Sequence, residues 1–220
     1  MYSPSEENYL KAIFMLGRKT DKAVNTNQLA KRLNAKASSI TDMVKKLSDK
    51  DLVDYEKYKG VSLTLTGERI ALSILRKHRL WETFLVEKLH FSWDEVHEIA
   101  EQLEHIQSRE LVNRLDEFLG FPEMDPHGDP IPDKNGRMIY RESQILSTLP
   151  VGTKVILVGL KDSSDAFLRY LDSRGLVLGD ALEIQAEEVY DRSLQIKKAN
   201  RIIILSEMAA NNLLVKKIER

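Results

Sequence analysis

The 220-residue sequence contains no cysteine. Disulfide bonds and thiolate metal sites are therefore excluded, and a bound metal ion would have to be held by oxygen ligands and imidazole nitrogen. The sequence also lacks an apolar run near the roughly 18 residues that a membrane span needs. Its first ten residues show neither the basic segment nor the apolar core of a signal peptide. We therefore expect an ordinary globular protein of the cytoplasm.

The chain has no strong net charge, since the formal value is -1. By itself this argues against a nucleic-acid-binding protein. The charges are nevertheless unevenly spread, because residues 1–73 carry 13 Lys/Arg and 9 Asp/Glu, whereas residues 91–133 carry 2 Lys/Arg and 12 Asp/Glu. A mildly basic N-terminal region followed by a strongly acidic middle indicates two different roles in one chain.

The N-terminal region has the element order of a winged helix-turn-helix. A capping box at Ser3–Glu6 begins a helix whose apolar stripe ends at Gly17. Two further helices and two β-like runs follow, at Asn27–Leu33, Ala37–Lys50, Leu52–Tyr58 and Ser62–Thr64. Helix, short turn, helix and hairpin in this order are typical of DNA-binding domains. A small helical domain with a hairpin and no DNA-binding role is the alternative.

The polar face of the third predicted helix favours DNA binding. Short or basic side chains, which can reach base edges and phosphates in a major groove, gather near its N-terminal half. We expect DNA contacts from this helix and from the hairpin tip, at Lys36, Ser38, Ser39, Thr41, Asp42, Lys45, Tyr58 and Lys59.

The remainder of the chain predicts a helical region and then a β-rich region. One helix is expected over Ala71–Leu89 and a second over Trp93–Leu119, before a linker at 122–136 that is rich in Pro, Gly and Asp. Short strands then alternate with Gly and Asp turns, at Lys154–Leu160, Ala181–Ala186, Ser193–Lys197 and Arg201–Leu205, with a short helix at Phe167–Leu171. This pattern predicts a small β-barrel of about 75 residues.

Histidine and glutamate cluster on one stripe of the second predicted helix. At 100° per residue, His97, Glu101, Glu104 and His105 fall within roughly 100° of one another. The preceding helix carries His78 and Glu82 at i and i+4, again on one face. A sulfur-free set of this kind suits Mn²⁺, Fe²⁺, Co²⁺ or Zn²⁺. The alternative is an acidic, solvated helix face with incidental histidines.

A run of about 130 residues resembles the diphtheria toxin repressor family of metalloregulators, which also contains the manganese-transport regulators. The segments that carry the resemblance appear in family order and are SEENYLKAIFML, LAKRLNAKASSITDMVKKL, YEKYKGVSLTLTGERIA, RKHRLWETFL, VHEIAEQLEHI and GDPIP. Residues 146–220 resemble the C-terminal domain of the longer members. The resemblance implies a mainly α fold with a winged helix-turn-helix over 1–72, a helical metal-binding and dimerisation domain over 73–145, and a small FeoA-like β-barrel over 146–220.

The same resemblance implies two metal sites. A primary site falls on Asn8, Glu101, Glu104 and His105, and an ancillary site falls on His78, Glu82 and His97. Asp162 and Asp165 are weak candidates for a further ligand from the C-terminal domain. Manganese-type members have a carboxylate at the position of Lys11, which cannot ligate a metal while it is charged. They also have Glu at 101, where iron-type members have Cys.

The implied function is repression of metal-uptake genes by a homodimer that binds a palindromic operator when metal is plentiful. Mn(II) is the expected activator, Fe(II) is the alternative, and Zn(II) or Co(II) can bind in vitro. Apolar side chains over 71–119 favour the dimer, among them Trp81, Leu85, Trp93, Val96, Leu103 and Leu111.

Two other functions fit parts of the sequence. One is a winged-helix regulator of an organic ligand, which a metal titration of DNA binding would distinguish. The other is a metal-dependent hydrolase, which needs an open coordination position and a substrate cleft. A metal held between two helices and capped by another domain offers little of either, so we do not expect an enzyme.

Overall fold

The computed structural model describes residues 2–20, 23–57 and 59–218. The chain divides into two compact units, which are described separately. The first contains residues 1–81, 101–114 and 132–137, and the second contains residues 82–100, 115–131 and 138–220. None of the described helices is both long and apolar enough to cross a membrane.

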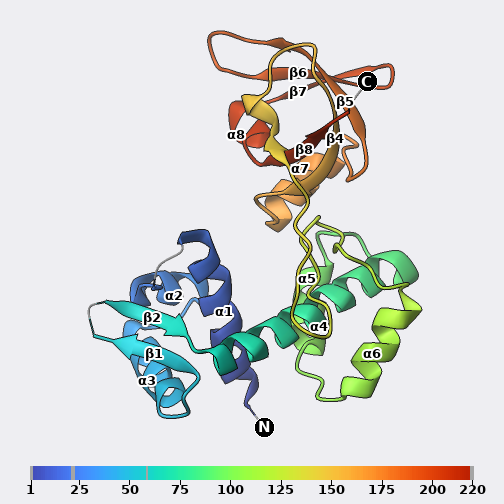
Figure 1. Cartoon of the computed structure of the whole chain (residues 1–220). Coiled ribbons are helices and arrows are strands. Elements are labelled where there is room, and N and C mark those ends of the chain that lie inside the picture. Colours follow the sequence, from blue (N-terminus) through green and yellow to red (C-terminus); the bar gives the residue numbers. More distant parts are fainter. Residues whose placement is uncertain (1, 21–22, 58, 219–220) are drawn as a thin grey trace. The chain divides into compact units, whose positions relative to one another are not determined.

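The first unit begins with the expected winged helix-turn-helix (Figure 1). Its elements are α1 (Pro4–Thr20), α2 (Thr26–Arg32), α3 (Ala37–Ser48), β1 (Val53–Glu56) and β2 (Gly60–Leu63). The predicted capping box is present, because the Ser3 hydroxyl accepts from the Glu6 amide at 3.3 Å and the Glu6 carboxylate accepts from the Ser3 amide at 3.0 Å. Helix α1 continues through Gly17, where the sequence predicted its end.

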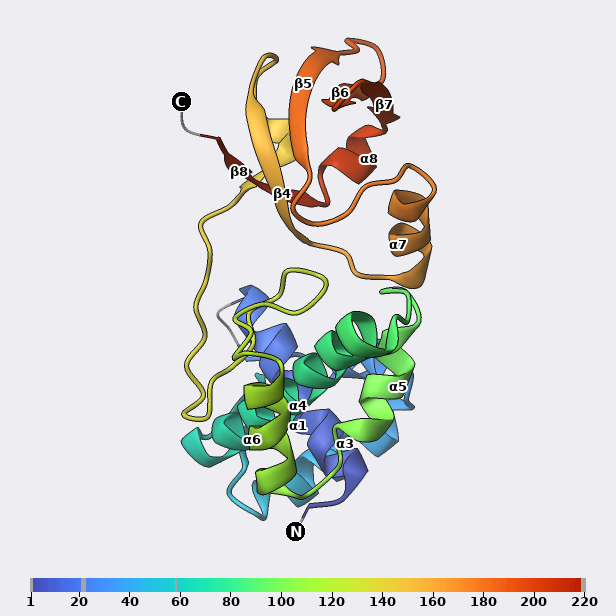
Figure 2. The same ribbon diagram turned by 90° about the vertical axis from the view of Figure 1, so that its right-hand side faces the viewer.

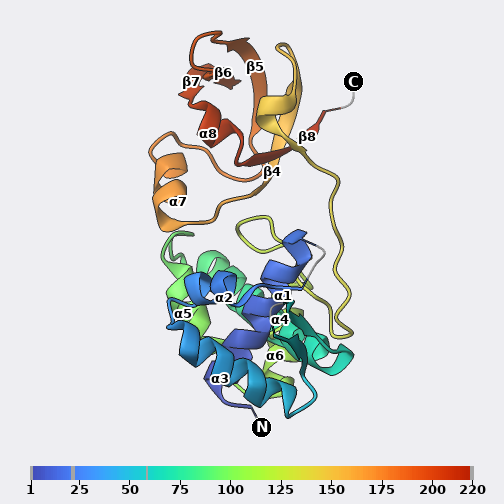
Figure 3. The same ribbon diagram turned by 90° about the vertical axis from the view of Figure 1, so that its left-hand side faces the viewer.

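Apolar faces of three helices and the hairpin form the core of this domain. Helix α1 packs against α2 and β2, and α3 packs against α2 and β1; Figure 3 shows α1, α2 and α3 together. The largest fully buried side chains of these elements are Leu10, Ile13, Leu29, Ile40 and Leu47. The opposite face of α3 is left to solvent, as a recognition helix requires.

A buried carboxylate joins the start of α1 to the end of α3. Glu6 is 2% exposed, and it accepts from Lys50 at 2.6 Å and from Lys46 at 3.0 Å. The hydrogen bond from Lys50 is the main reason why the pKa of the Glu6 carboxyl lies at about 2, well below its ordinary value of 4.5. The ionised carboxylate therefore stabilises the fold fully above pH 4.5, and this stabilisation is lost as the pH falls through about 2.

We expect Glu6→Gln to lower the free energy of unfolding by about 1–3 kcal/mol at pH 7, because a buried carboxylate with two ammonium partners is lost. The difference from the unmodified chain should shrink as the pH is lowered from 4.5 toward 2. Denaturant unfolding followed by circular dichroism measures both values. Glu110→Gln is the control, since Glu110 is exposed and its one ion pair among the described residues is with Arg114, one turn away, and a change under about 0.5 kcal/mol is expected there. An equal loss in both variants would contradict the assignment.

The helical region differs from the prediction in two places. Helix α4 (Leu65–Leu89) begins six residues earlier than expected. The single helix expected over Trp93–Leu119 is wrong, because the chain forms α5 (Val96–Leu103) and α6 (Arg109–Phe118) with a break between them. Ser108 begins the second helix, since its hydroxyl accepts from the Leu111 amide at 3.2 Å. Glu104 and His105 therefore lie in the turn after α5, where the helical-wheel angles no longer apply.

The C-terminal part of the second unit is an open sheet rather than the expected closed barrel (Figure 2). Its elements are β3 (Gln144–Ile145), a 3-10 turn (Leu146–Thr148), β4 (Lys154–Leu160), α7 (Asp165–Asp172), β5 (Ala181–Glu187), β6 (Leu194–Lys198), β7 (Arg201–Leu205), α8 (Glu207–Ala210) and β8 (Leu213–Lys217). The strands are antiparallel in the order β3-β8-β4-β5-β6-β7. Among the described residues no ladder joins β3 to β7, and the two residues of β3 are too few to close the sheet.

Trp93 belongs to the core of this sheet domain. The sequence placed it on a dimerisation surface, but it belongs to the same buried apolar cluster as Leu146, Leu168 and other side chains of the second unit. Its indole Nε1 donates to Asp172 Oδ1 at 2.9 Å. The segment before α5 is thereby attached to the sheet domain by both packing and a partly buried hydrogen bond.

Candidate metal centres and DNA interface

Two carboxylates of the α5 end face a lysine of α1 within the first unit. Lys11 Nζ lies 2.6 Å from Glu101 Oε1 and 2.7 Å from each oxygen of Glu104. The Glu104 side chain is fully buried and that of Lys11 is 11% exposed. An elementary positive charge therefore already lies between the two glutamates.

Two histidines border the same carboxylates. His78 Nδ1 lies 2.6 Å from Glu104 Oε2, and His105 Nε2 lies 3.9 Å from Glu104 Oε1. The other ring nitrogen of His105 is 2.6 Å from Glu7 Oε2. We call Glu7, Lys11, His78, Glu101, Glu104 and His105 the α1 cluster. Donor atoms of His78, Glu101 and Glu104 lie within 4.8 Å of one another, close enough to bind one ion.

Glu7 and Asn8 complete the α1 side of this cluster. Glu7 is buried and also accepts from Gln107 Nε2 at 3.1 Å. The sequence analysis did not select it, although it lies one helical turn before Lys11 and so shares its face. Asn8 Oδ1 is buried and has no hydrogen-bond partner among the described residues. A carbonyl oxygen, carboxylates and an imidazole are the donors that a hard divalent cation prefers, and the orphan Asn8 Oδ1 lies on the same helix as Glu7 and Lys11, so these residues fit a metal ion.

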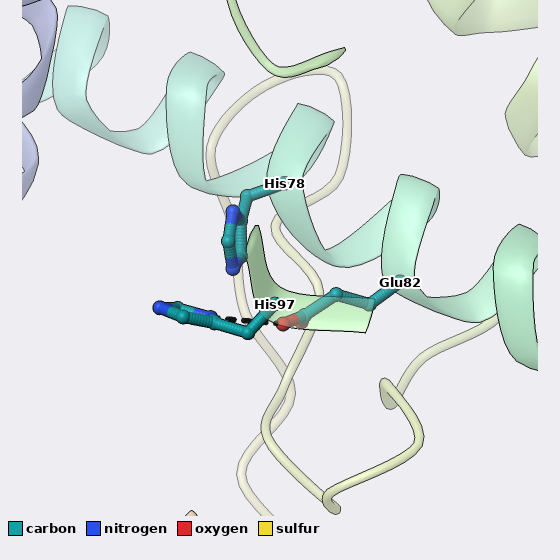
Figure 4. A group of neighbouring side chains, drawn as sticks. All are labelled: His78, Glu82 and His97. Carbon is teal, nitrogen blue, oxygen red and sulfur yellow. Dashed lines mark hydrogen bonds and ion pairs between the residues drawn. The ribbon is translucent and has the colours of Figure 1, made fainter. Parts of the chain in front are cut away.

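Figure 4 shows a second group, which we call the α4 cluster: His78, Glu82 and His97. His78 and Glu82 lie one turn apart on α4, and Glu82 Oε1 is 3.3 Å from His97 Nδ1. Ligand atoms of the three residues lie within 4.8 Å of one another. The buried pair and the 48% exposed His97 side chain would leave such a site open to solvent on one side.

A third group, the loop cluster, consists of Glu82, Asp125 and His127, and all three are buried. His127 Nδ1 lies 3.9 Å from Glu82 Oε2, while its Nε2 lies 2.9 Å from the Trp93 carbonyl. Asp125 Oδ1 accepts from the backbone amides of His127 and Asp129 at 2.8 and 2.9 Å.

Asp125 and His127 of the loop cluster were missed because they lie in the segment that the sequence analysis interpreted as a linker. The available signal was the three titratable side chains in Asp125–Asp129, separated by Pro126 and Gly128, which favour a tight turn. Gly128 fixes this turn against β4, since a Cβ there would lie 2.4 Å from the Val158 carbonyl oxygen. Neither Asp162 nor Asp165 joins a candidate group in the described part of the chain, and Asp162 Oδ1 accepts from the Ser164 amide instead.

The candidate DNA interface is the solvent face of α3. Exposed side chains there and at its N-cap are Lys36, Ser38, Ser39, Asp42 and Lys45. Thr41 is half-buried, and its hydroxyl donates to the Ala37 carbonyl at 3.0 Å, which leaves its lone pairs available to accept. In the hairpin, Lys59 is exposed and pairs with Glu56, while Tyr58 lies outside the described residues.

Three family models match the chain: "Iron dependent repressor, N-terminal DNA binding domain" over residues 1–61, "Iron dependent repressor, metal binding and dimerisation domain" over 64–133, and "FeoA domain" over 145–217. An uncharacterized helix-turn-helix transcriptional regulator of Methanocaldococcus jannaschii is 40% identical over 117 residues, which are 53% of this chain and 94% of that protein. The chain belongs to the diphtheria toxin repressor family of metal-dependent transcriptional repressors.

Both manganese and iron regulators occur among the relatives in this family. The solved structure of a manganese-dependent transcriptional repressor in complex with manganese has a TM-score of 0.86 and 34% identity, covering 97% of this chain and all of that one. The iron-dependent repressor IdeR of Mycobacterium leprae is 31% identical over 126 residues, and the matched region spans 54% of its length. This member of the family is therefore a DNA-binding, dimerising repressor rather than an enzyme.

Proposed function

We propose that this repressor binds its operator when Mn(II) is bound at a primary site formed by Asn8, Glu101, Glu104 and His105. The supporting observation is the α1 cluster, in which side chains of the DNA-binding domain contact the turn after α5. An ion held there attaches α1 to the dimerisation region. We assign residues 1–72 to DNA binding, 73–145 to metal binding and dimerisation, and 146–220 to the FeoA-like domain.

Attachment of α1 matters because a dimer presents two recognition helices to one duplex. Both helices reach successive major grooves only when their separation matches the half-site spacing. A metal ion bound by the side chains of the primary site would restrict α1, and with it α3, to the arrangement that matches this spacing. By linkage, operator DNA must then increase metal affinity by the same factor as metal increases operator affinity.

The donor set favours manganese. Oxygen donors from Glu101, Glu104 and Asn8 outnumber the imidazole of His105, and the chain contains no cysteine that could supply a thiolate. Fe(II) is the alternative activator. Zn(II) and Co(II) are expected to bind in vitro because both lie above Mn(II) in the general order of affinity, so affinity alone does not identify the physiological metal.

The α4 cluster is proposed as an ancillary site, with His78, Glu82 and His97 as its ligands. The loop cluster shares Glu82 and offers two more buried donors, Asp125 and His127. Glu82 Oε1 faces His97 and Glu82 Oε2 faces His127. A single ion bound by Glu82 together with Asp125 and His127 is therefore an alternative to an ion bound by His97.

For the operator we propose that Ser39, Thr41 and Lys45 face the major groove, Thr41 toward a base and Lys45 toward a phosphate. Lys36 and Ser38 would contact phosphates, Asp42 would face a base edge, and the hairpin residues Tyr58 and Lys59 would contact the backbone or the minor groove. A repressor of this kind acts where the operator DNA is, which places it in the cytoplasm.

The test is operator binding under anaerobic conditions with each metal in turn. An operator is first selected from a random duplex pool with Mn(II) present, and its dissociation constant is then measured by fluorescence anisotropy for chelator-treated protein with Mn(II), Fe(II), Co(II) or Zn(II). We expect Mn(II) to tighten binding by roughly 5–150-fold, the usual range of allosteric coupling. Chelator-treated protein that binds as tightly as the Mn(II) form would refute metal activation, and a stronger response to Fe(II) at buffered cellular concentrations would refute the choice of manganese.

A further inference from the structure

The Lys11 ammonium lies where the proposed function places a divalent ion. We propose that Lys11 is the resident cation of the α1 cluster, and that a divalent ion binds Glu101 and Glu104 only by displacing it. This inference rests on the proposed function, because it concerns the same two carboxylates. It adds that a cation of the chain itself competes with the metal for these carboxylates.

All three protons of the Lys11 ammonium have a hydrogen-bond acceptor. An ammonium group has three protons to donate, and Lys11 Nζ has three carboxylate oxygens at 2.6, 2.7 and 2.7 Å. Since the Glu104 side chain is fully buried, water does not compensate it if the lysine leaves. The metal-free cluster is therefore already assembled, with α1 joined to Glu101 and Glu104 by an internal cation.

A divalent ion and the ammonium cannot use the same oxygens together. Like charges at contact distances repel strongly in a site from which water is excluded, and the three oxygens that Lys11 contacts are the ones an ion would need. Binding must therefore include the free energy of breaking a buried ion pair and moving the lysine. This cost lowers the metal affinity, so that the site fills only at high concentrations of metal.

The Lys11 ammonium and a divalent metal ion would satisfy different ligand atoms at this site. Without metal, Lys11 connects α1 to Glu101 and Glu104. Its three protons are all donated to carboxylate oxygens, so none is left for a further acceptor. The orphan Asn8 Oδ1, which lies one turn before Lys11 on α1, cannot interact with a carboxylate and needs a cation or a donor. Replacement of the ammonium by a divalent ion would add Asn8 and an imidazole to the same attachment.

Three variants of the full-length chain test the proposal. Lys11→Met removes the charge and keeps an extended apolar stem, Lys11→Arg keeps the charge, and Lys197→Met is the matched control on an exposed position of β6. For each, the melting temperature of the metal-free protein is measured, and Mn(II) affinity is measured from the EPR signal of free Mn(II). Neither readout requires operator binding.

We expect Lys11→Met to bind Mn(II) roughly tenfold or more tightly than the unmodified chain, since no ion pair has to be broken. Its metal-free form should melt roughly 5–10 °C lower, because Glu101 and Glu104 lose their counter-charge. Lys11→Arg and Lys197→Met should show neither change. The gain must disappear in the double variant Lys11→Met/Glu104→Gln, which locates it at this cluster.

An Mn(II) affinity within twofold of the unmodified chain would overturn the proposal, as would a gain that persists in the double variant. If Lys11→Met does not fold, the unmodified protein decides the matter by NMR of ¹⁵N-labelled lysine during titration with diamagnetic Zn(II). A Lys11 Nζ signal that is unchanged at saturation would overturn displacement. Failure of metal to alter operator binding would refute the proposed function and leave these readouts standing, so the two failures can be told apart.

Discussion

Replacing His105 with alanine should remove metal activation of operator binding. The unmodified repressor is expected to bind its operator roughly 5–150-fold more tightly with Mn(II), and in His105→Ala this ratio should fall to within about twofold of one. The physical reason is the position of the imidazole, whose two nitrogens face Glu7 of α1 and Glu104 of the turn after α5. Without it, the ion loses its only proposed nitrogen donor, and α1 loses one of its contacts to that turn.

The measurement is the operator dissociation constant of each variant, by fluorescence anisotropy, with chelator and with saturating Mn(II). His90→Asn is the control. His90 is exposed, belongs to no candidate metal group of the described chain, and has a φ of 59°, a conformation that asparagine accepts. Its activation ratio should match that of the unmodified chain. Full metal activation in His105→Ala, at an unchanged melting temperature, would show that the switch lies at another site.

Local signals in the sequence were sufficient for the elements that carry the site. The capping box at Ser3–Glu6 and the polar face of α3 depend on neighbours within a few residues, and both were found correctly. The i and i+4 spacing likewise placed His78 and Glu82 on one face of α4. Glu101 and Glu104 were selected as a pair on one helix, and they do face one partner, although Glu104 lies just beyond the helix end.

Features that depend on contacts between residues far apart in the sequence could not be predicted from such local patterns. His127 gains its place from the close approach of Gly128 to β4, about thirty residues away along the chain, and no periodicity records this. The open sheet depends on whether its edge strands, β3 and β7, pair with each other, and these strands lie more than fifty residues apart in the sequence. Periodicity also gave no sign that Lys11 lies inside the α1 cluster, because a lysine on an amphipathic helix usually extends into solvent; only the family resemblance pointed to that position.

Gly67 shows how one such distant contact fixes the helix that carries His78 and Glu82. It lies in the first turn of α4, with its amide donating to the Thr64 hydroxyl at 3.1 Å. An added Cβ would lie 2.0 Å from the carbonyl oxygen of Leu52 and 3.0 Å from its carbonyl carbon. Real side chains do not approach backbone this closely, so α4 can begin here, directly against the end of the α3–β1 connection, only with glycine.

We expect Gly67→Ala to lower the free energy of unfolding by at least about 2–3 kcal/mol, because the backbone of Leu52 or of α4 must move to admit the methyl group. This sign is the reverse of the usual one, since alanine in place of glycine inside a helix normally stabilises by roughly 1 kcal/mol. Gly17→Ala is the matched control. Gly17 is also helical, and its added Cβ would make only ordinary contact, 3.6 Å from Val24 Cγ2.

Denaturant unfolding of the two alanine variants, followed by circular dichroism, should therefore give opposite shifts, with Gly17→Ala equal to or more stable than the unmodified chain. The displaced start of α4 should also weaken metal activation in Gly67→Ala, because α4 connects the hairpin to His78 and Glu82. A Gly67→Ala variant as stable as Gly17→Ala would mean that α4 can shift away from Leu52 at little cost.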